Sequence, residues 1–79
     1  MELTDFTKKI SDQFLEEDQH KITSEIEFRS LPSWDSLTGM AVITTIEDEY
    51  KVSINIDDFK QMKRILDIFN YVNAQSKKS

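Results

Sequence analysis

The chain has 79 residues, enough for one small domain, and we expect a single domain over residues 1–79. With only one Gly and one Pro, the composition favours helices over a β-fold with many turns. The absence of Cys excludes disulfides, thiolate metal sites and a cysteine nucleophile. With 10 Lys and Arg against 15 Asp and Glu, the net charge of -5 disfavours nucleic acids and anionic membranes as partners and favours basic protein patches.

The chain shows no targeting or membrane signal. Its first residues, MELTDFTKKI, lack the apolar segment of a signal peptide, and no apolar run is long enough to span a bilayer. We therefore expect a cytoplasmic monomer that does not bind membranes.

The first predicted element is an amphipathic helix near the start of the chain. Its apolar residues recur at spacings of three and four, and Leu15 widens the stripe. These residues are Leu3, Phe6, Ile10 and Phe14. Thr4 or Asp5 is the expected cap, and the polar run over residues 16–20 marks the end of the helix.

A long irregular connection is predicted between His20 and Asp35. Its apolar residues follow neither a helical nor a strand period, so we expect them to anchor a loop. They are Ile22, Ile26, Phe28 and Leu31. Pro32 argues against a continuous helix, and Trp34 closes the loop.

The second strong helical pattern begins at Ser36 and runs to Tyr50, with Asp35 or Ser36 as the cap. Gly39 in its first turn costs up to about 1 kcal/mol relative to Ala. The short alternating stretch that follows has no second strand to pair with, so we predict an extended loop with Val52 and Ile54 pointing inward.

Two further helices complete the prediction. A short one runs from Asp57, as its cap, to about Met62, with Phe59 and Met62 inward. The last carries an apolar stripe at three-and-four spacing and is followed by a frayed polar tail over residues 75–79. Its stripe consists of Ile65, Ile68, Phe69 and Val72. The predicted fold is an all-α, small four-helix bundle with three main helices and one short helix.

The tetrapeptide Trp34-Asp35-Ser36-Leu37 stands at the junction of the long loop and the second helix. A Ser at this position is typical of an ordinary N-cap, and a three-residue match is common by chance. A helix N-terminus also suits a phosphodiester, because its N–H groups are unpaired and it carries a partial positive charge. No base lies beside Ser36 in the sequence, so we interpret it as an acceptor modified by another enzyme, in a protein that is not itself an enzyme.

From Asp35 onward, the stretch DSLTGMAVITTIEDEYKVSINIDDFKQMKRILDIFNYV resembles, without a gap, the acyl carrier protein family, whose modification site is an Asp-Ser-Leu at the start of the second helix. Upstream, Ile22-Thr23 and Phe28 match loop positions at the expected distance from the Ser. The resemblance covers nearly the whole chain.

This resemblance implies that 4′-phosphopantetheine from coenzyme A is attached to the Ser36 hydroxyl, flanked by Asp35 and Leu37, and that its thiol carries acyl groups as thioesters. It implies a phosphopantetheinyl transferase as one partner. The others are acyl- or condensing-type enzymes of fatty acid, polyketide, polysaccharide or related biosynthesis, whose basic patches meet the second helix at Met40, Glu47 and Asp48. The implied acyl pocket is lined by Val42, Ile43, Ile46, Phe59, Met62, Ile65, Ile68 and Phe69.

The chain departs from the family pattern at three positions. Thr38 and Ala41 stand where many members carry acidic residues, and Trp34 stands where housekeeping members carry a small one. These departures resemble specialised carriers, and the bulky Phe59 and Phe69 favour a restricted pocket for short or polar acyl groups.

Purely structural interpretations of these residues remain open at this point. Asp35 can be only a cap, Trp34 only a hydrophobic staple, and Glu47 and Asp48 only a solvated face. The chain as a whole can be an unmodified, acidic helical protein-interaction module. His20 and the scattered carboxylates lack metal-ligand spacing, so no metal is expected.

Overall fold

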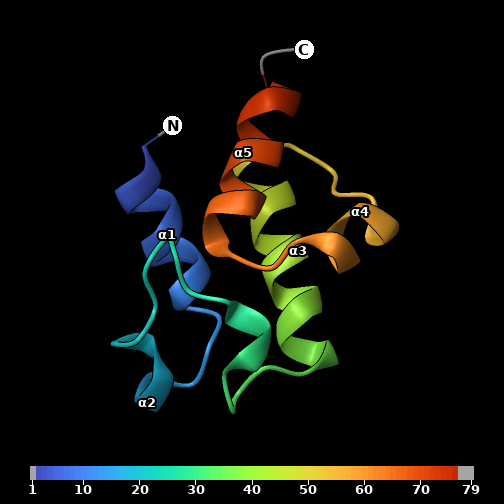
Figure 1. Cartoon of the computed structure of the whole chain (residues 1–79). Coiled ribbons are helices and arrows are strands. Elements are labelled where there is room, and N and C mark those ends of the chain that lie inside the picture. The colour runs from blue at the N-terminus through green and yellow to red at the C-terminus, as the bar shows by residue number, and fades with distance from the viewer. Residues whose placement is uncertain (1, 77–79) are drawn as a thin grey trace.

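The computed structural model describes residues 2–76. The helices, in chain order, are α1 (Leu3–Ser11), α2 (Glu16–Gln19), the 3-10 helix η1 (Phe28–Ser30), α3 (Ser36–Tyr50), α4 (Ile56–Gln61) and α5 (Ile65–Ser76) (Figure 1). An isolated antiparallel bridge between Glu27 and Arg64 is the only β-type pairing within the described part of the chain. The predicted all-α bundle is confirmed, with two more short helices than expected, α2 and η1. None of the helices in residues 2–76 is both long and apolar enough to span a bilayer.

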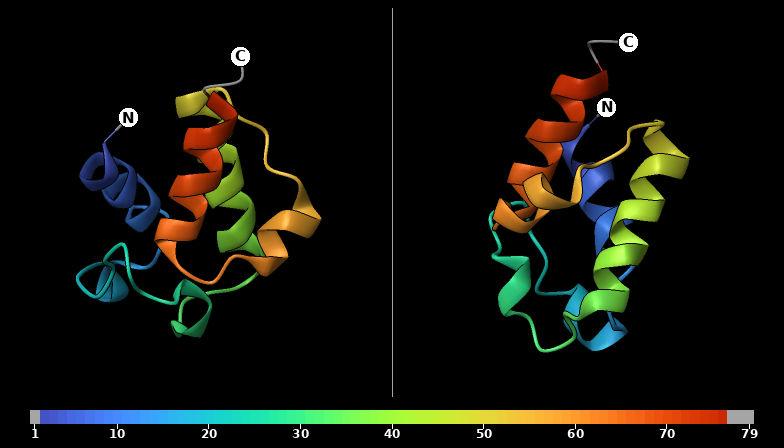
Figure 2. Two further views of the ribbon diagram at one scale, coloured as in Figure 1. Left: turned by 45° about the horizontal axis from the view of Figure 1, so that its top comes forward. Right: turned by 90° about the vertical axis from the view of Figure 1, so that its right-hand side faces the viewer.

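The bundle is built around three helices that pack pairwise: α1 on α3, α1 on α5, and α3 on α5. The short α4 lies across the side of α3 and α5 that is remote from α1 (Figures 1 and 2). The start of α3 is at the opposite end of the bundle from the end of α5 (Figure 1). The long loop and η1 close that end, so the predicted attachment residue stands beside a well-anchored loop.

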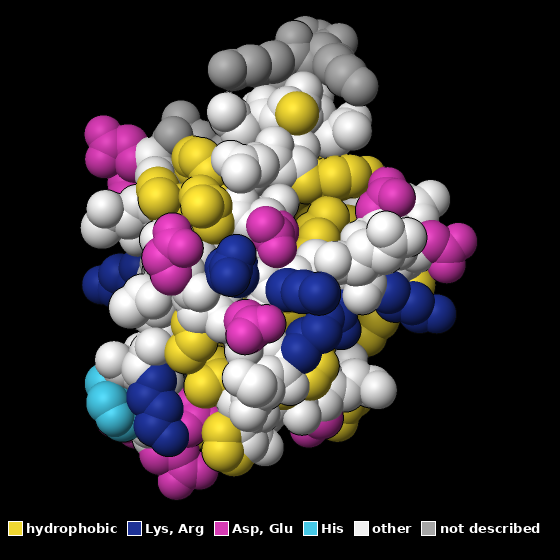
Figure 3. Space-filling view, in the orientation of Figure 1, with side chains coloured by type: hydrophobic (Ala, Val, Ile, Leu, Met, Phe, Trp, Pro, Cys, Tyr) yellow, Lys and Arg dark blue, Asp and Glu magenta, His cyan; other side chains and the backbone are white. Residues whose placement is uncertain are grey.

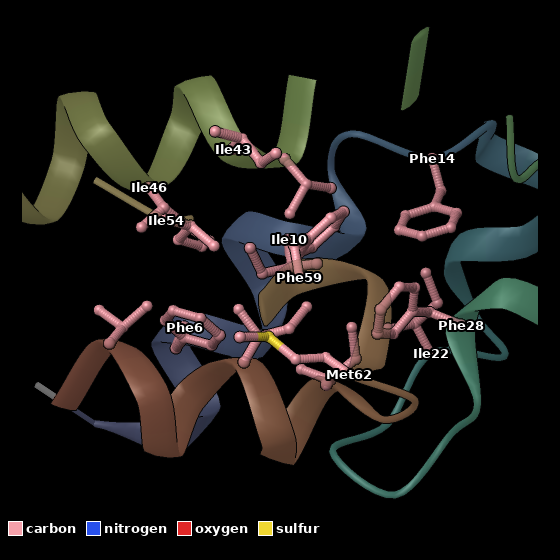
Figure 4. Packing of buried hydrophobic residues seen from close by; sticks show 14 of the residues in the cluster. Phe6, Ile10, Phe14, Ile22, Phe28, Ile43, Ile46, Ile54, Phe59 and Met62 are labelled. Atoms are coloured by element: carbon pink, nitrogen blue, oxygen red, sulfur yellow. The ribbon is translucent and has the colours of Figure 1, made fainter. Parts of the chain in front are cut away.

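The core is formed by the inward faces of all three main helices and by side chains from the connections (Figure 4). Its most deeply buried residues are Phe6, Ile10, Phe28, Val42, Ile46, Ile65, Ile68 and Val72. The loop anchors Ile22, Phe28 and Leu31 are buried as predicted, and Ile26 is half-buried. Val52 and Ile54 also point inward, which confirms the extended loop before α4.

The prediction for the first helix was wrong at both ends. No side chain caps α1: Glu2 is its N-cap residue and makes no side-chain cap hydrogen bond, so Thr4 and Asp5 do not have that role. The helix ends at Ser11, because the chain turns there. Leu15 therefore lies outside the stripe and is 59% exposed. The polar run after it does more than mark the end of the first helix, because residues 16–19 form the single turn of α2.

Two further boundaries differ from the prediction. The cap of α4 is Asn55, whose Oδ1 accepts the N–H groups of Asp57 and Asp58 at 2.8 and 3.3 Å, so Asp57 is inside the helix. The last helix continues to Ser76, so residues 75 and 76 are helical rather than frayed. Residues 77–79 of the predicted tail lie outside the described residues.

Candidate functional site

The start of α3 is fixed by a local hydrogen-bond pair. The Asp35 carboxylate accepts the Thr38 N–H at 2.7 Å, and the Thr38 hydroxyl donates to the Ser33 carbonyl oxygen at 3.2 Å. The Thr38 N–H lowers the pKa of Asp35 below its ordinary value. Asp35 is therefore the N-cap, as one of the two predicted caps, and it is ionised at neutral pH.

Ser36 is the first residue of α3, and its side chain is exposed. The next residue, Leu37, is 80% exposed. The first N–H groups of a 15-residue helix lack intrahelical acceptors and carry a partial positive charge, which suits an anion attached at this point. Within residues 2–76 no imidazole or carboxylate hydrogen-bonds to the Ser36 hydroxyl, so a base for its activation has to come from elsewhere.

An open cavity of about 460 Å³ lies beside Ser36, between the start of α3, η1 and α4. Its floor is mainly apolar and its volume is within the range of small-molecule sites. The lining residues are Arg29, Trp34, Asp35, Ser36, Gly39, Met40, Ile43, Ile56, Phe59 and Lys60.

The predicted acyl-pocket residues are only partly brought together at this cavity. Ile43 and Phe59 line it. Five others are buried in the core and do not line it: Val42, Ile46, Met62, Ile65 and Ile68. Phe69 is half-buried on α5, where its ring packs edge-on against Phe6 at 5.5 Å. The space next to Ser36 is therefore a surface cavity that ends at the aromatic floor, rather than a channel through the bundle.

Trp34 forms one wall of this cavity and packs on the first turns of α3. A Cβ atom on residue 39 would lie 3.3 Å from the Trp34 ring, so the ring packs directly against the glycine backbone. The same ring stacks with Phe14 at 5.9 Å and meets Phe28 edge-on at 4.9 Å. Trp34 thus joins the long loop to α3, in agreement with its interpretation as a staple, while one face is left to the cavity.

Arg29 is a site residue that sequence reasoning missed. Its Nε donates to the Met62 carbonyl oxygen at 2.9 Å, and its Nη2 donates to the carbonyl oxygen of Phe59. The guanidinium lies 5.1 to 5.4 Å from the ring centres of Phe28, Trp34 and Phe59. Arg29 therefore ties η1 to the end of α4 and holds the cavity wall. Its hydrogen-bond partners are 30 and 33 positions away in the sequence, so no local sequence pattern predicts them.

A buried carboxylate holds the loop that leads to the site. Asp18, at the end of α2, is only 3% exposed and accepts the Ser33 N–H at 3.1 Å and the Lys21 ammonium at 3.2 Å. Ser33, followed by Lys21, lowers the pKa of Asp18 against the opposing effect of burial. Asp18 thus connects α2 to the segment immediately before Trp34.

The predicted partner residues fall at two distances from Ser36. Met40 is 56% exposed and lines the cavity. Glu47 and Asp48 are exposed but lie at the other end of α3, about 17 to 18 Å further along the helix axis. No group of three or more His, Asp or Glu side chains in residues 2–76 could hold a metal ion.

Comparison with known proteins identifies the family to which the chain belongs. The family model described as phosphopantetheine attachment site matches residues 8–72. The acyl carrier protein of Exiguobacterium sibiricum is 27% identical over 73 residues, which cover 92% of this chain and 91% of that protein. No solved structure matches the chain. The chain therefore belongs to the family of phosphopantetheine-binding carrier proteins, whose cofactor is covalently attached 4′-phosphopantetheine.

Proposed function

We propose that Ser36 is the residue to which 4′-phosphopantetheine is attached, and that the protein carries acyl groups between biosynthetic enzymes. The observation that carries the proposal is the exposed Ser36 hydroxyl at the first position of the longest helix. The residues present fit the group, because the helix start favours a phosphodiester and the cavity beside Ser36 has room for part of the arm. Bound there, the arm supplies a thiol that carries the acyl group as a thioester.

The chain's own part in attachment is to present an acceptor. The Ser36 oxygen forms a bond to the pantetheine-linked phosphorus of coenzyme A. The pyrophosphate bond breaks, 3′,5′-ADP leaves with the bonding electrons, and the hydroxyl proton passes to a base of the transferase. Asp35 fixes the turn that presents Ser36, and we propose Asp35 and Leu37 as contacts for the transferase.

We further propose a single cytoplasmic carrier domain that works as a monomer and has no catalytic site of its own. Its partners are a phosphopantetheinyl transferase and enzymes of fatty acid, polyketide, polysaccharide or related biosynthesis. The first turn of α3 carries no acidic side chain, and Trp34 adjoins the attachment residue. Both features support a specialised carrier over a housekeeping one.

Intact-mass spectrometry after incubation with coenzyme A and a broad-specificity transferase tests the attachment. We expect the mass of one 4′-phosphopantetheinyl group to be added to the wild type and to Ser53→Ala, in which another exposed serine is removed. Ser36→Ala should gain nothing. Addition to Ser36→Ala, or no addition to the wild type with several transferases, would contradict the proposal and favour an unmodified interaction module.

A further inference from the structure

Asp18 differs from every other acidic residue in the described part of the chain. Charged side chains and the histidine cover the outside of α2, at the lower left of Figure 3. Asp18 belongs to the same single turn but is only 3% exposed, whereas all other Asp and Glu residues within 2–76 are exposed. Burying a carboxylate is costly unless it is paired and hydrogen-bonded. The groups that Asp18 binds therefore indicate what its burial achieves.

The main chain of Ser33 is held from two sides. The Asp18 carboxylate accepts its N–H at 3.1 Å, and the Thr38 hydroxyl donates to its carbonyl oxygen at 3.2 Å. Asp18 lies 15 positions before Ser33, and Thr38 lies five positions after it. These two hydrogen bonds, which we call the Ser33 brace, join α2 to the first turn of α3 through a residue of the loop between them.

The brace acts on the segment that carries Ser36. Besides holding Ser33, Thr38 donates its N–H to the Asp35 carboxylate at 2.7 Å, and the Gly39 N–H donates to the Asp35 carbonyl oxygen at 3.0 Å. The main chain is thus fixed at two points before Ser36, while the Ser36 side chain itself stays exposed. The arrangement holds the backbone and leaves the hydroxyl accessible.

A fixed backbone matters for a hydroxyl that has to react in another enzyme's active site. Transfer is fast when the two reacting atoms are held about 3–3.5 Å apart and aligned, and a misplacement of about 1 Å can cost 100-fold in rate. From this geometry we propose that Thr38 and Asp18 are positioning residues for the modification of Ser36, acting through the Ser33 brace. Neither residue touches the reacting atoms. The inference rests on the attachment of the arm to Ser36.

A pair of substitutions at Thr38 tests the brace. Thr38→Val keeps the shape and the backbone N–H but removes the hydroxyl, whereas Thr38→Ser keeps the hydroxyl. Initial rates of 4′-phosphopantetheine transfer from coenzyme A, measured by intact mass at several carrier concentrations, give kcat and KM. We expect Thr38→Val to lower kcat about fivefold, as the loss of one hydrogen bond can, with KM within about twofold of the wild type. Thr38→Ser should restore kcat to within about twofold.

Variants of Asp18 test the other side of the brace. Asp18→Ala should lower kcat about as much as Thr38→Val does, and Asp18→Asn should recover most of it, because its carbonyl oxygen can still accept the Ser33 N–H. The double variant Asp18→Ala/Thr38→Val should be no slower than the slower single variant, since both substitutions release the same residue. Amide exchange of the Ser33 N–H should also become several-fold faster in Thr38→Val, although its acceptor is unchanged.

Two controls separate positioning from overall stability. Thr44→Val removes an exposed hydroxyl from the same helix. Ile68→Val removes one methylene from a completely buried side chain of α5 and should lower the melting temperature. We expect both controls to keep the kcat of the wild type, with all rates measured below the onset of unfolding.

Several outcomes would contradict the inference. Wild-type kcat in Thr38→Val, or no recovery in Thr38→Ser, would overturn it while leaving the attachment proposal intact. A change in KM alone would mean that the Thr38 side chain is a contact for the transferase. An equal fall of kcat in Ile68→Val would assign the effect to stability. If the wild type gains no mass at all, the attachment proposal fails first and this inference with it.

Discussion

Gly39 illustrates how a residue with poor helix propensity shapes the site. In the first turn of α3 a glycine costs up to about 1 kcal/mol relative to alanine. The structure gives the compensation: a Cβ atom there would lie 3.3 Å from Cη2 of Trp34 and 3.7 Å from Cε2 of Phe59. The absent side chain lets the Trp34 ring pack directly on the helix and leaves the cavity open beside Ser36.

Two substitutions at Gly39 should therefore have different effects. Gly39→Ala gains helix propensity and loses a little contact distance, so we expect its free energy of unfolding to stay within about 1 kcal/mol of the wild type. Gly39→Leu has to displace Trp34, and we expect a loss of about 1–3 kcal/mol. Urea denaturation followed by circular dichroism measures both. Equal stability of the two variants would show that Trp34 does not need the glycine.

At the scale of elements, the single turn of α2 is held to the site by one carboxylate. Asp18 is buried and accepts hydrogen bonds from Ser33 and Lys21, and its pKa is lowered from 3.8. A group whose pKa is lower in the folded protein stabilises it fully above the unfolded-state pKa. That contribution is lost as the pH falls through the folded-state pKa.

Asp18→Ala should accordingly lower the melting temperature by about 5 °C at neutral pH, because the half-buried Ser33 N–H loses its acceptor. The difference from the wild type should be constant down to about pH 4 and should shrink below it, as Asp18 of the wild type becomes protonated. Asp12→Ala, which removes an exposed carboxylate, is the control. A difference that persists unchanged at pH 2.5 would mean that the Asp18 charge plays no part.

The sequence predicted best those elements whose signals are local. The apolar spacing within α3 and α5 sufficed to place them, and the Asp35 cap was recognisable because the accepting carboxylate and the N–H that donates to it are three residues apart. The first helix was extended to Leu15 because Phe14 continues its period, yet Phe14 is buried from a turn after the helix has ended. The apolar pattern reports which side chains are buried, and it does not report the backbone that buries them.

The residues of the site likewise divide into those with a local sequence signal and those without one. Ser36 and Asp35 were identified from adjacent residues, whereas Arg29 and Lys60 join the site only when η1 and α4 are folded against α3. The Arg29 hydrogen bonds span 30 or more positions and end on backbone carbonyls, which have no sequence signature at all. Likewise, five residues expected to line an acyl pocket fill the core, because the helices pack closely enough to leave no space between them.

For the whole molecule, the acidic side chains of α3 lie far from Ser36. Glu47 and Asp48 are exposed at the C-terminal end of α3, while Arg29, Asp35 and Lys60 are the charged residues that line the cavity at its start. A partner with a basic patch would thus contact α3 at a distance from Ser36, and its catalytic groups would have to reach back about 17 to 18 Å to this proposed attachment residue. Long-range charge of this kind accelerates association more than it strengthens a formed complex.

The double reversal Glu47→Lys and Asp48→Lys should therefore slow modification of Ser36 by the transferase several-fold at low salt and have little effect at high salt. Stability should not fall, because positive charge at a helix C-terminus is favourable. The matched control reverses Glu16 and Glu17, which are exposed on α2. Initial rates from a time course of intact masses give the comparison. Unchanged rates at low salt would remove Glu47 and Asp48 from the partner surface.

The position of Trp34 also allows its fluorescence to report on the cavity beside Ser36. It is the only tryptophan in the chain, and one side of its half-buried ring faces the cavity beside Ser36. Indole emission shifts to shorter wavelength when water leaves the ring. An arm folded into the cavity would displace that water, and an arm extended toward an enzyme would let it return. The wavelength of emission from an unlabelled sample can therefore follow whether the cargo is sheltered or presented.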